Sequence, residues 1–266
     1  MKQDYRLGTI DHGLYFFSKT IVYSLLSMVL LFPACSKQES TLRHTPVVTI
    51  VKAMSPGVVN ISTEHTAVVK NQAVKLPSLG SGVIIDKNGL ILTNAHVLQQ
   101  ASTIYIIFSD GTKIQGKVVG LNQVHDLAII KIDSPFPLTV IPMAASDDIL
   151  IGEPVIALGN PFGLSSSVST GVVSAIHRDL FTPQGQIIFK DLIQTDTAIN
   201  PGSSGGALLN MDGKLIGLNQ IVAQQAQGIG FAIPVKTIKP LLVEFETNYD
   251  KMSRSLPASN TGKSQT

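Results

Sequence analysis

The chain has 266 residues, of which 44% are hydrophobic and 14% are charged, and it contains one cysteine. This length and composition predict one or two globular domains with a sizeable core and an additional apolar segment. A formal net charge of +2, without a dense basic cluster, argues against a nucleic-acid partner. The six histidines have no Cys or His partner at metal-ligand spacing, so we expect no metal and no other cofactor.

An apolar run at residues 21–32 follows three basic residues, which is the order of charged and apolar regions in a secretory signal. The run is short for a membrane-spanning helix, and extending it back to Leu14 would place Lys19 in the hydrocarbon region. Cys35 follows in a sequence that resembles a bacterial lipoprotein processing site. We therefore expect a lipid anchor on Cys35, with a signal-anchor or ordinary secretion as the alternatives.

Short apolar segments between turn residues dominate the next part of the chain. Residues 47–54 fit a helix by their apolar spacing or a strand by their β-branched content, and residues 64–79 fit a long hairpin or loop. Strands are predicted at 58–63, 83–85, 90–92, 103–108, 113–121 and 127–132. His96 follows the strand that ends at residue 92, and Asp126 directly precedes the strand that begins at residue 127.

The pattern of short strands continues after a proline-containing crossover at 134–148. Strands are predicted at 152–158, 168–176, 187–194, 214–220 and 228–233. A terminal helix is predicted from Pro234 to about residue 248, because proline is favoured in the first turn of a helix. Many short strands with glycine turns, and few helical periodicities, predict an all-β architecture of two barrels.

The stretch from Thr195 to Leu209 contains the sequence Gly-Ser-Ser-Gly-Gly. Glycines on either side of two serines allow a tight turn and a close approach of a substrate to the main chain. The N–H groups of Gly202 and Ser204 would then point at one spot, where they would stabilise the oxyanion of an acyl transfer to serine. The alternative is a glycine-rich β-turn without catalytic function.

A nucleophilic serine needs a histidine to take its proton and a carboxylate to orient that histidine. His96 and Asp126 supply these groups, and the order His, Asp, Ser is that of the chymotrypsin arrangement rather than the subtilisin or α/β-hydrolase order. His125 is a poor alternative base, because adjacent residues of an extended chain point to opposite faces. The alternative for His96 and Asp126 is a structural role in their turns.

Four short motifs resemble one known family. They are Thr93-Asn-Ala-His96, His125-Asp-Leu-Ala128, Gly159-Asn-Pro-Phe-Gly163 and Gly202-Ser-Ser-Gly-Gly206. Together they resemble the HtrA (Deg) family of trypsin-like serine proteases, over roughly residues 46–245. The family usually has Asn before the nucleophile where this chain has Ser203, and the Gly-x-Ser-Gly-Gly frame favours Ser204 as the nucleophile. Many trypsin-like enzymes carry at the position of Ser203 an aspartate that pairs with a newly cut N-terminus, so we do not expect activation by that route.

The resemblance implies a two-lobed double β-barrel of the chymotrypsin/trypsin type with short peripheral helices, including a helix at 47–54. It also implies a serine endopeptidase that degrades unfolded or damaged proteins on the periplasmic side of the bacterial cell envelope. A homotrimer is expected from the family, and the residues after the second barrel are too few for the PDZ domain that family members commonly carry. The competing hypotheses are a binding or chaperone protein of the same fold with a resting oxyanion site, and an esterase.

The substrate pocket is expected to be apolar. Ala198 lies six residues before the nucleophile, where trypsin-like enzymes that select basic residues have aspartate. Ile199, Leu218 and Val222 fall on positions that line the pocket in the family. Because β-branched walls narrow a pocket, we expect cleavage after Val, Ala, Ile or Thr.

The expected domain organisation follows from these assignments. It comprises a signal or anchor segment at 1–35, a tether at 36–45, a protease domain at 46–248 and a disordered tail at 249–266. Within the protease domain we expect one lobe at about 58–133, a second lobe at about 146–233 and the terminal helix at about 234–248.

Overall fold

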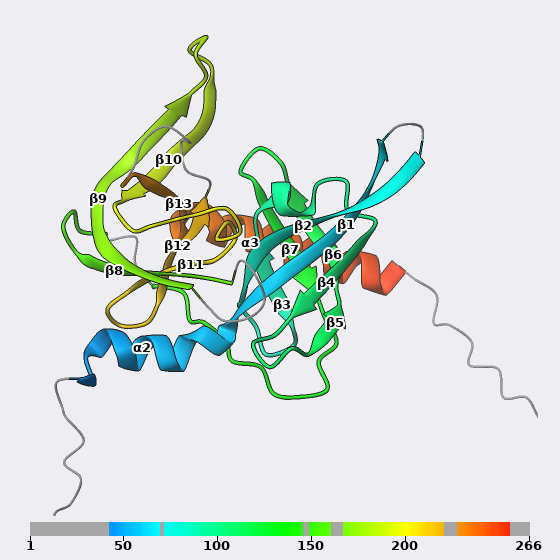
Figure 1. Ribbon diagram of the computed structural model, residues 1–266, viewed down its shortest axis with the longest axis horizontal. Helices are drawn as coiled ribbons and strands as arrows, with labels where there is room; N and C mark the ends of the chain where they lie inside the picture. The colour runs from blue at the N-terminus through cyan, green and yellow to red at the C-terminus, as the bar shows by residue number, and fades with distance from the viewer. Residues whose placement is uncertain (1–42, 70–71, 146–148, 161–166, 221–227, 256–266) are drawn as a thin grey trace, which may run out of the picture. The chain divides into compact units, whose positions relative to one another are not determined.

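The computed structural model describes residues 43–69, 72–145, 149–160, 167–220 and 228–255 (Figure 1). The chain divides into two units, residues 1–44 and 45–266, and the helices and strands below all belong to the second unit. Several sequence predictions therefore fall outside the described residues. They concern the signal segment with Cys35, the end of the Gly159–Gly163 motif and the pocket residue Val222. No helix in the described ranges is long and apolar enough to cross a bilayer.

The helix α2 (Pro46–Met54) forms where the sequence left helix and strand open. Thr45 caps it, because its hydroxyl accepts a hydrogen bond from the N–H of Val48 at 3.3 Å, and Pro46 occupies the first turn. The helix ends at the 3₁₀ turn η2 (Ser55–Gly57). Apolar side chains at helical spacing pack from α2 against the protein core: Val47, Ile50, Val51 and Met54. The prediction of a helix is confirmed.

The first lobe is a seven-stranded antiparallel sheet in the order β5-β4-β1-β2-β3-β7-β6. Its strands are β1 (Val58–Val69), β2 (Gln72–Ile84), β3 (Leu90–Thr93), β4 (Thr103–Ile107), β5 (Lys113–Gln115), β6 (Lys117–Asn122) and β7 (Leu127–Lys131). The predicted loop or hairpin at 64–79 is a hairpin, since β1 and β2 pair without a shift of register. The predicted strand 113–121 is divided at Gly116, whose N–H bonds the carbonyl of Ile104 at 3.0 Å. Gly116 thus still bonds β4, whereas Lys117 pairs with Lys131 of β7, and this change of partner strand separates β5 from β6.

The second lobe is a closed barrel in the order β10-β13-β12-β11-β8-β9. Its strands are β8 (Pro154–Gly159), β9 (Ser167–Phe181), β10 (Ile187–Thr195), β11 (Ala207–Asn210), β12 (Leu215–Gln220) and β13 (Gly230–Pro234). β9 and β10 continue beyond the barrel as a long hairpin (Figure 1). The sequence pattern does not predict β11 as a separate strand, because its four residues are nearly all buried and show no alternation of apolar and polar side chains.

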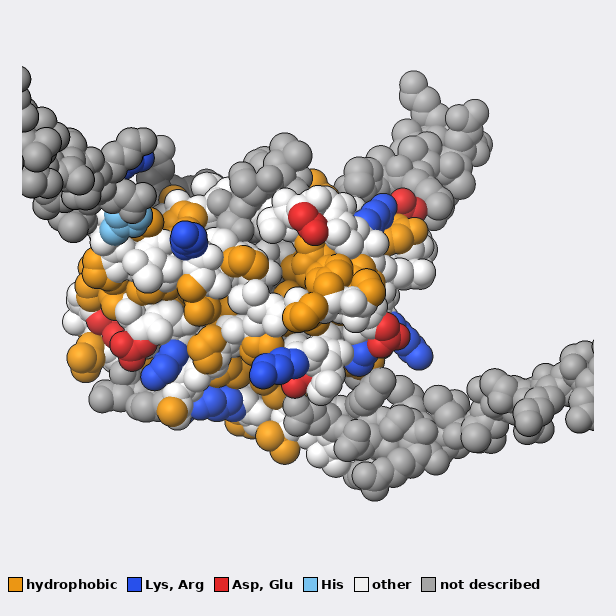
Figure 2. Space-filling model, turned by 90° about the horizontal axis from the view of Figure 1, so that it is seen from below, with side chains coloured by type: hydrophobic (Ala, Val, Ile, Leu, Met, Phe, Trp, Pro, Cys, Tyr) orange, Lys and Arg blue, Asp and Glu red, His pale blue; other side chains and the backbone are white. Residues whose placement is uncertain are grey.

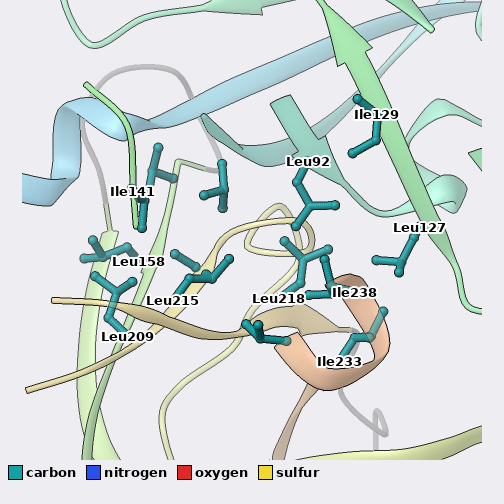
Figure 3. Close-up of a cluster of buried hydrophobic side chains, with 14 of the residues drawn as sticks. Leu92, Leu127, Ile129, Ile141, Leu158, Leu209, Leu215, Leu218, Ile233 and Ile238 are labelled. Atoms are coloured by element: carbon teal, nitrogen blue, oxygen red, sulfur yellow. The ribbon is translucent and has the colours of Figure 1, made fainter. Parts of the chain in front are cut away.

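A core cluster joins the two lobes (Figure 3). Leu92 and Ile129 enter it from the first sheet, Leu158 and Leu218 enter it from the barrel, and Ile238 enters it from the terminal helix α3 (Val235–Ser255). All five side chains are at most 2% exposed. Because a single cluster is shared, the loops of one lobe are held in a fixed relation to those of the other. The all-β, two-lobed fold is confirmed, while α3 continues to Ser255 rather than ending near residue 248.

Charged side chains of both signs are scattered among apolar and uncharged ones on the face shown in Figure 2. Such mixing gives no large field of one sign on this face. Its electrostatics therefore add nothing in favour of a polyanionic partner.

Candidate active site

His96 is delivered by the strand β3 and the short 3₁₀ helix η3 (Ala95–Leu98) that follows it. The other three residues of η3 are buried: Ala95, Val97 and Leu98. The His96 side chain keeps 31% of its surface exposed. Burial of its neighbours thus fixes the backbone while leaving the imidazole accessible.

Asp126 lies directly before β7 in the left-handed backbone region, with φ of 52°. Asp adopts this conformation more readily than most residues. The Asp126 carbonyl accepts hydrogen bonds from the N–H of Ala95 at 3.1 Å and from Nδ2 of Asn94 at 3.0 Å. The turn before β7 is therefore tied to the turn that carries His96.

His96 and Asp126 form a two-point contact. The Asp126 Oδ2 lies 2.6 Å from Nδ1 of His96, and Oδ1 accepts the backbone N–H of His96 at 2.8 Å. The Asp126 side chain is only 9% exposed. With Nδ1–H donating to the carboxylate, the basic nitrogen of the imidazole is Nε2. This is the arrangement that a general base requires.

Gln220, at the end of β12, is a part of the site that the sequence analysis missed. Its Nε2 donates to Oδ2 of Asp126 at 2.8 Å, and the residue is only 1% exposed. The preceding residue, Asn219, accepts the N–H of Gly205 with its carbonyl at 2.9 Å. The end of β12 therefore connects the serine turn of the second lobe with the carboxylate of the first. A glutamine at a strand end carries no sequence signal for this role.

The serine turn begins with a β-turn from Asn200 to Ser203, closed by a 2.8 Å hydrogen bond from the Ser203 N–H to the Asn200 carbonyl. Pro201 occupies its second position, and Gly202 occupies its third with φ of 88°. These are the preferences of a type II turn. Ser204 follows and is 5% exposed.

Three N–H groups of the serine turn are bonded, and two have no acceptor among the described residues. Those of Ser203, Gly205 and Gly206 each donate to a backbone carbonyl at 2.8–2.9 Å. Those of Gly202 and Ser204 donate to no acceptor among the described residues. These two groups are the ones predicted to bind an oxyanion.

The serine turn lies against the strand that leads to His96. A Cβ added to Gly205 would lie 2.5 Å from Oγ1 of Thr93, at the end of β3. No hydrogen bond joins the Ser204 hydroxyl to His96 within the described part of the chain. By contrast, His125 is exposed and bonds Oδ1 of Asn122 through its N–H at 3.0 Å. The structure thus places His96, not His125, on the carboxylate of Asp126.

A cavity of about 430 Å³ lies beside the serine turn. Its described lining residues carry no charged side chain and are Ala157, Leu158, Gly159, Ser167, Val168, Ser169, Ala198, Asn200, Pro201, Ser203 and Asn219. Ile199 is 5% exposed and packs against Gly230, and Leu218 has no exposed surface. This does not fit the pocket-lining role predicted for Leu218, because a fully buried core side chain cannot contact a substrate. Within the described ranges no His, Cys, Asp and Glu side chains group to hold a metal ion.

The sequence model of the trypsin-like peptidase domain matches residues 80–218, more than half of the chain. The periplasmic serine endoprotease DegP of Escherichia coli (strain K12) is 45% identical over 174 residues, which cover 64% of this chain and 36% of that protein. The putative serine protease HhoB of Synechocystis sp. is 39% identical over 210 residues, which cover 70% of this chain and 50% of that protein.

A solved structure agrees with these relatives. The HtrA-type protease AlgWS227A with a decapeptide has a TM-score of 0.68 and 34% identity, covering 75% of this chain and 66% of that one. The chain therefore belongs to the trypsin-like serine peptidase family. Its group within that family is HtrA (Deg), as the four motifs predicted. The chain spans half or less of the length of the two curated relatives.

We predict that Gln220→Leu slows the reaction of Ser204 with a fluorophosphonate about tenfold. The change removes one of three hydrogen bonds to the Asp126 carboxylate, and a bond to a charged group is worth about 1.5–3 kcal/mol. The labelling rate is measured by intact mass. Gln115→Leu, on the exposed part of β5, is the matched control and should label at the wild-type rate. A wild-type rate in folded Gln220→Leu would contradict the role of Gln220.

Proposed function

We propose that the chain is a serine endopeptidase that cleaves polypeptides through an acyl-enzyme on Ser204. The observation that carries this proposal is the short contact from His96 to Asp126, beside Gly202 and Ser204 N–H groups that have no acceptor among the described residues. The Ser204 oxygen attacks the scissile carbonyl carbon, and its proton passes to Nε2 of His96. The two N–H groups bind the oxygen that becomes negative.

Collapse of the tetrahedral intermediate breaks the peptide bond. The leaving amine takes the proton from His96, and the acyl group stays on Ser204 as an ester. Water then attacks the carbonyl carbon of this ester and gives a proton to His96. The bond from this carbon to the Ser204 oxygen breaks, His96 passes the proton to that oxygen, and the carboxylic acid product leaves. Asp126 orients the imidazole and stabilises its charged form throughout.

The competing function is a binding or chaperone protein that rests with a collapsed oxyanion site. Such a state would arise if the Gly202 or Ser204 N–H bonded a protein carbonyl or if its peptide unit turned away from the substrate. Within the described residues neither is consumed, and Gly202 has the positive φ of the type II turn. These observations favour the peptidase.

The substrates proposed are unfolded or damaged proteins of the bacterial envelope. DegP of Escherichia coli and of Salmonella typhimurium are named periplasmic serine endoproteases, and this supports a periplasmic location. The quality-control role and the homotrimer rest on the likeness to the HtrA group. The domain limits of 46–248 for the protease and 1–35 for the signal or anchor remain part of the proposal.

We predict that Ser204→Ala lowers the hydrolysis of casein by at least about 10³-fold, because it removes the nucleophile. Ser203→Ala should change the rate by less than about threefold, because Ser203 is not the predicted nucleophile and its side chain lines the neighbouring cavity instead. Both residues are at most 7% exposed, so the two variants remove similar buried groups and control for each other. The reverse order of effects would show that Ser203 is the nucleophile.

Cleavage is predicted after Val, Ala, Ile or Thr. None of the described residues that line the cavity beside the serine turn is charged, and Ala198 supplies no carboxylate for a basic side chain. Mass spectrometry of a digested unfolded protein maps the cut sites. A majority of cuts after Arg, Lys or Phe would contradict this specificity.

The mature protein is predicted to begin at a lipidated Cys35 on the periplasmic side. The apolar run 21–32 would reach about 18 Å as a helix, which is short of the roughly 30 Å hydrocarbon core. Acyl chains on Cys35 contribute about 0.8 kcal/mol per buried CH₂, and more than one chain gives stable anchoring. Because Ser36 rather than Asp follows Cys35, we propose the outer membrane by resemblance to lipoprotein sorting signals.

Palmitate labelling and intact mass of the wild type and of Cys35→Ala test this anchor. Label and a mass starting at residue 35 are expected for the wild type only. An unlabelled wild-type protein that retains residues 1–34 would indicate a signal-anchor instead.

A further inference from the structure

Ser81, in β2 of the first lobe, reaches the serine turn of the second lobe. Its backbone N–H donates to the carbonyl of Ser204 at 2.9 Å, and its hydroxyl donates to the carbonyl of Gly202 at 2.7 Å. Ser81 has no exposed surface. One buried residue therefore holds the carbonyls of both residues whose N–H groups are free to bind an oxyanion.

The Ser81 hydroxyl is fixed by a second contact. Its oxygen accepts the N–H of Asn160 at 2.8 Å, so its single proton is directed at Gly202. The Asn160 carbonyl in turn accepts Nδ2 of Asn60 at 2.8 Å, and Thr93 donates its hydroxyl to the Ser81 carbonyl at 2.7 Å. Strands β1, β2 and β3 and the end of β8 thus all orient this one side chain.

The fit between Ser81 and the serine turn is close. A Cβ on Gly205 would lie 2.2 Å from the Ser81 carbonyl oxygen, which is far inside van der Waals contact. Gly205 is therefore required partly by Ser81, in addition to its positive φ of 83°. No side chain separates Ser81 from the peptide units next to the nucleophile.

The two anchored carbonyls flank the catalytic amide. The Ser204 N–H belongs to the peptide unit between Ser203 and Ser204, and Ser81 holds the unit before it and the unit after it. Gly202 lacks a Cβ and can adopt many backbone conformations at little cost. Without the hydroxyl, the Gly202 carbonyl and the Asn160 N–H would both lose their partner, and the turn would no longer be held in one conformation.

We propose that Ser81 is a positioning residue for peptide hydrolysis, whose hydroxyl holds the serine turn in the conformation that binds the oxyanion. The inference rests on the proposed peptidase function. Ser81 does not touch the reacting atoms; it acts through Gly202 and Ser204. The sequence gives no local signal for this role of Ser81, which lies just before the predicted strand 83–85.

The test is Ser81→Ala in the full chain, with steady-state hydrolysis of a peptide amide. The turnover number kcat should fall roughly 10- to 100-fold with KM changed less than about threefold. This is less than the 10²–10³-fold typical when an oxyanion donor itself is removed. Ser134→Ala is the matched control, because the Ser134 hydroxyl also donates to a carbonyl, that of Phe136, at 2.8 Å outside the site. It should keep the wild-type kcat.

A second measurement distinguishes loss of the oxyanion-binding conformation of the serine turn from a general loss of order in the substrate site. The affinity of a peptide boronic acid, which forms a tetrahedral adduct with Ser204, should fall by the same factor as kcat/KM. The affinity of the corresponding product peptide should stay within about threefold of the wild type. An equal loss of both affinities, or a wild-type kcat in folded Ser81→Ala, would overturn the proposal.

A further variant covers the case in which Ser81→Ala does not fold. Ser81→Cys fills the space but donates only a weak hydrogen bond. Its kcat should lie below that of the wild type and above that of Ser204→Ala. A wild-type kcat in Ser81→Cys would again overturn the proposal. If neither the wild type nor Ser134→Ala reacts with a fluorophosphonate at Ser204, the peptidase function itself fails, which is a different result.

Discussion

The buried carboxylate of Asp126 is the group on which the arrangement of the site depends. A charge that is mostly removed from water is costly unless hydrogen bonds compensate it. Three donors do so here, two from His96 and one from Gln220. Each bond to a charged group contributes about 1.5–3 kcal/mol, so loss of any one of them leaves the buried carboxylate less stabilised. Satisfying Asp126 therefore orients the imidazole and links the first lobe to the second.

The core that the two lobes share holds them in one relative position. Leu92 and Ile129 from the sheet pack with Leu158 and Leu218 from the barrel, and each fully buried side chain of this kind contributes about 1.5–3 kcal/mol. Leu92 lies four residues before His96, and Leu158 lies two residues before Asn160, which bonds Ser81. Packing thus fixes the strand ends from which the catalytic loops leave. The loops can then be irregular without losing their relative positions.

The three residues predicted to be catalytic carry a local signal in the sequence, and the structure brings two of them, His96 and Asp126, into contact. His96 and Asp126 stand at the ends of apolar strands, and Ser204 stands between glycines, so each could be found from its immediate neighbours. Gln220 could not be found this way, because its role depends on a carboxylate 94 positions away that only the folded chain brings near.

The errors in the fold and the pocket have similar physical causes. The four-residue strand β11 is nearly all buried and so shows no alternation, and β5 is separated from β6 because the pairing changes from β4 to β7 after Gly116. Leu218 was assigned to the substrate pocket from the family pattern, whereas packing against the other lobe buries it completely. Burial depends on which faces meet in three dimensions, and a pattern along the chain does not specify that.

The central claim is that a His–Asp pair from one lobe activates a serine of the other. Fluorophosphonate labelling followed by peptide mapping, performed on the wild type, Asp126→Asn and His125→Ala, tests this most directly. Label is expected on Ser204 in the wild type and in His125→Ala, and the labelling rate of Asp126→Asn should be lower by up to about 10⁴-fold. A wild-type protein that takes no label, or an Asp126→Asn variant that labels at the wild-type rate, would contradict it.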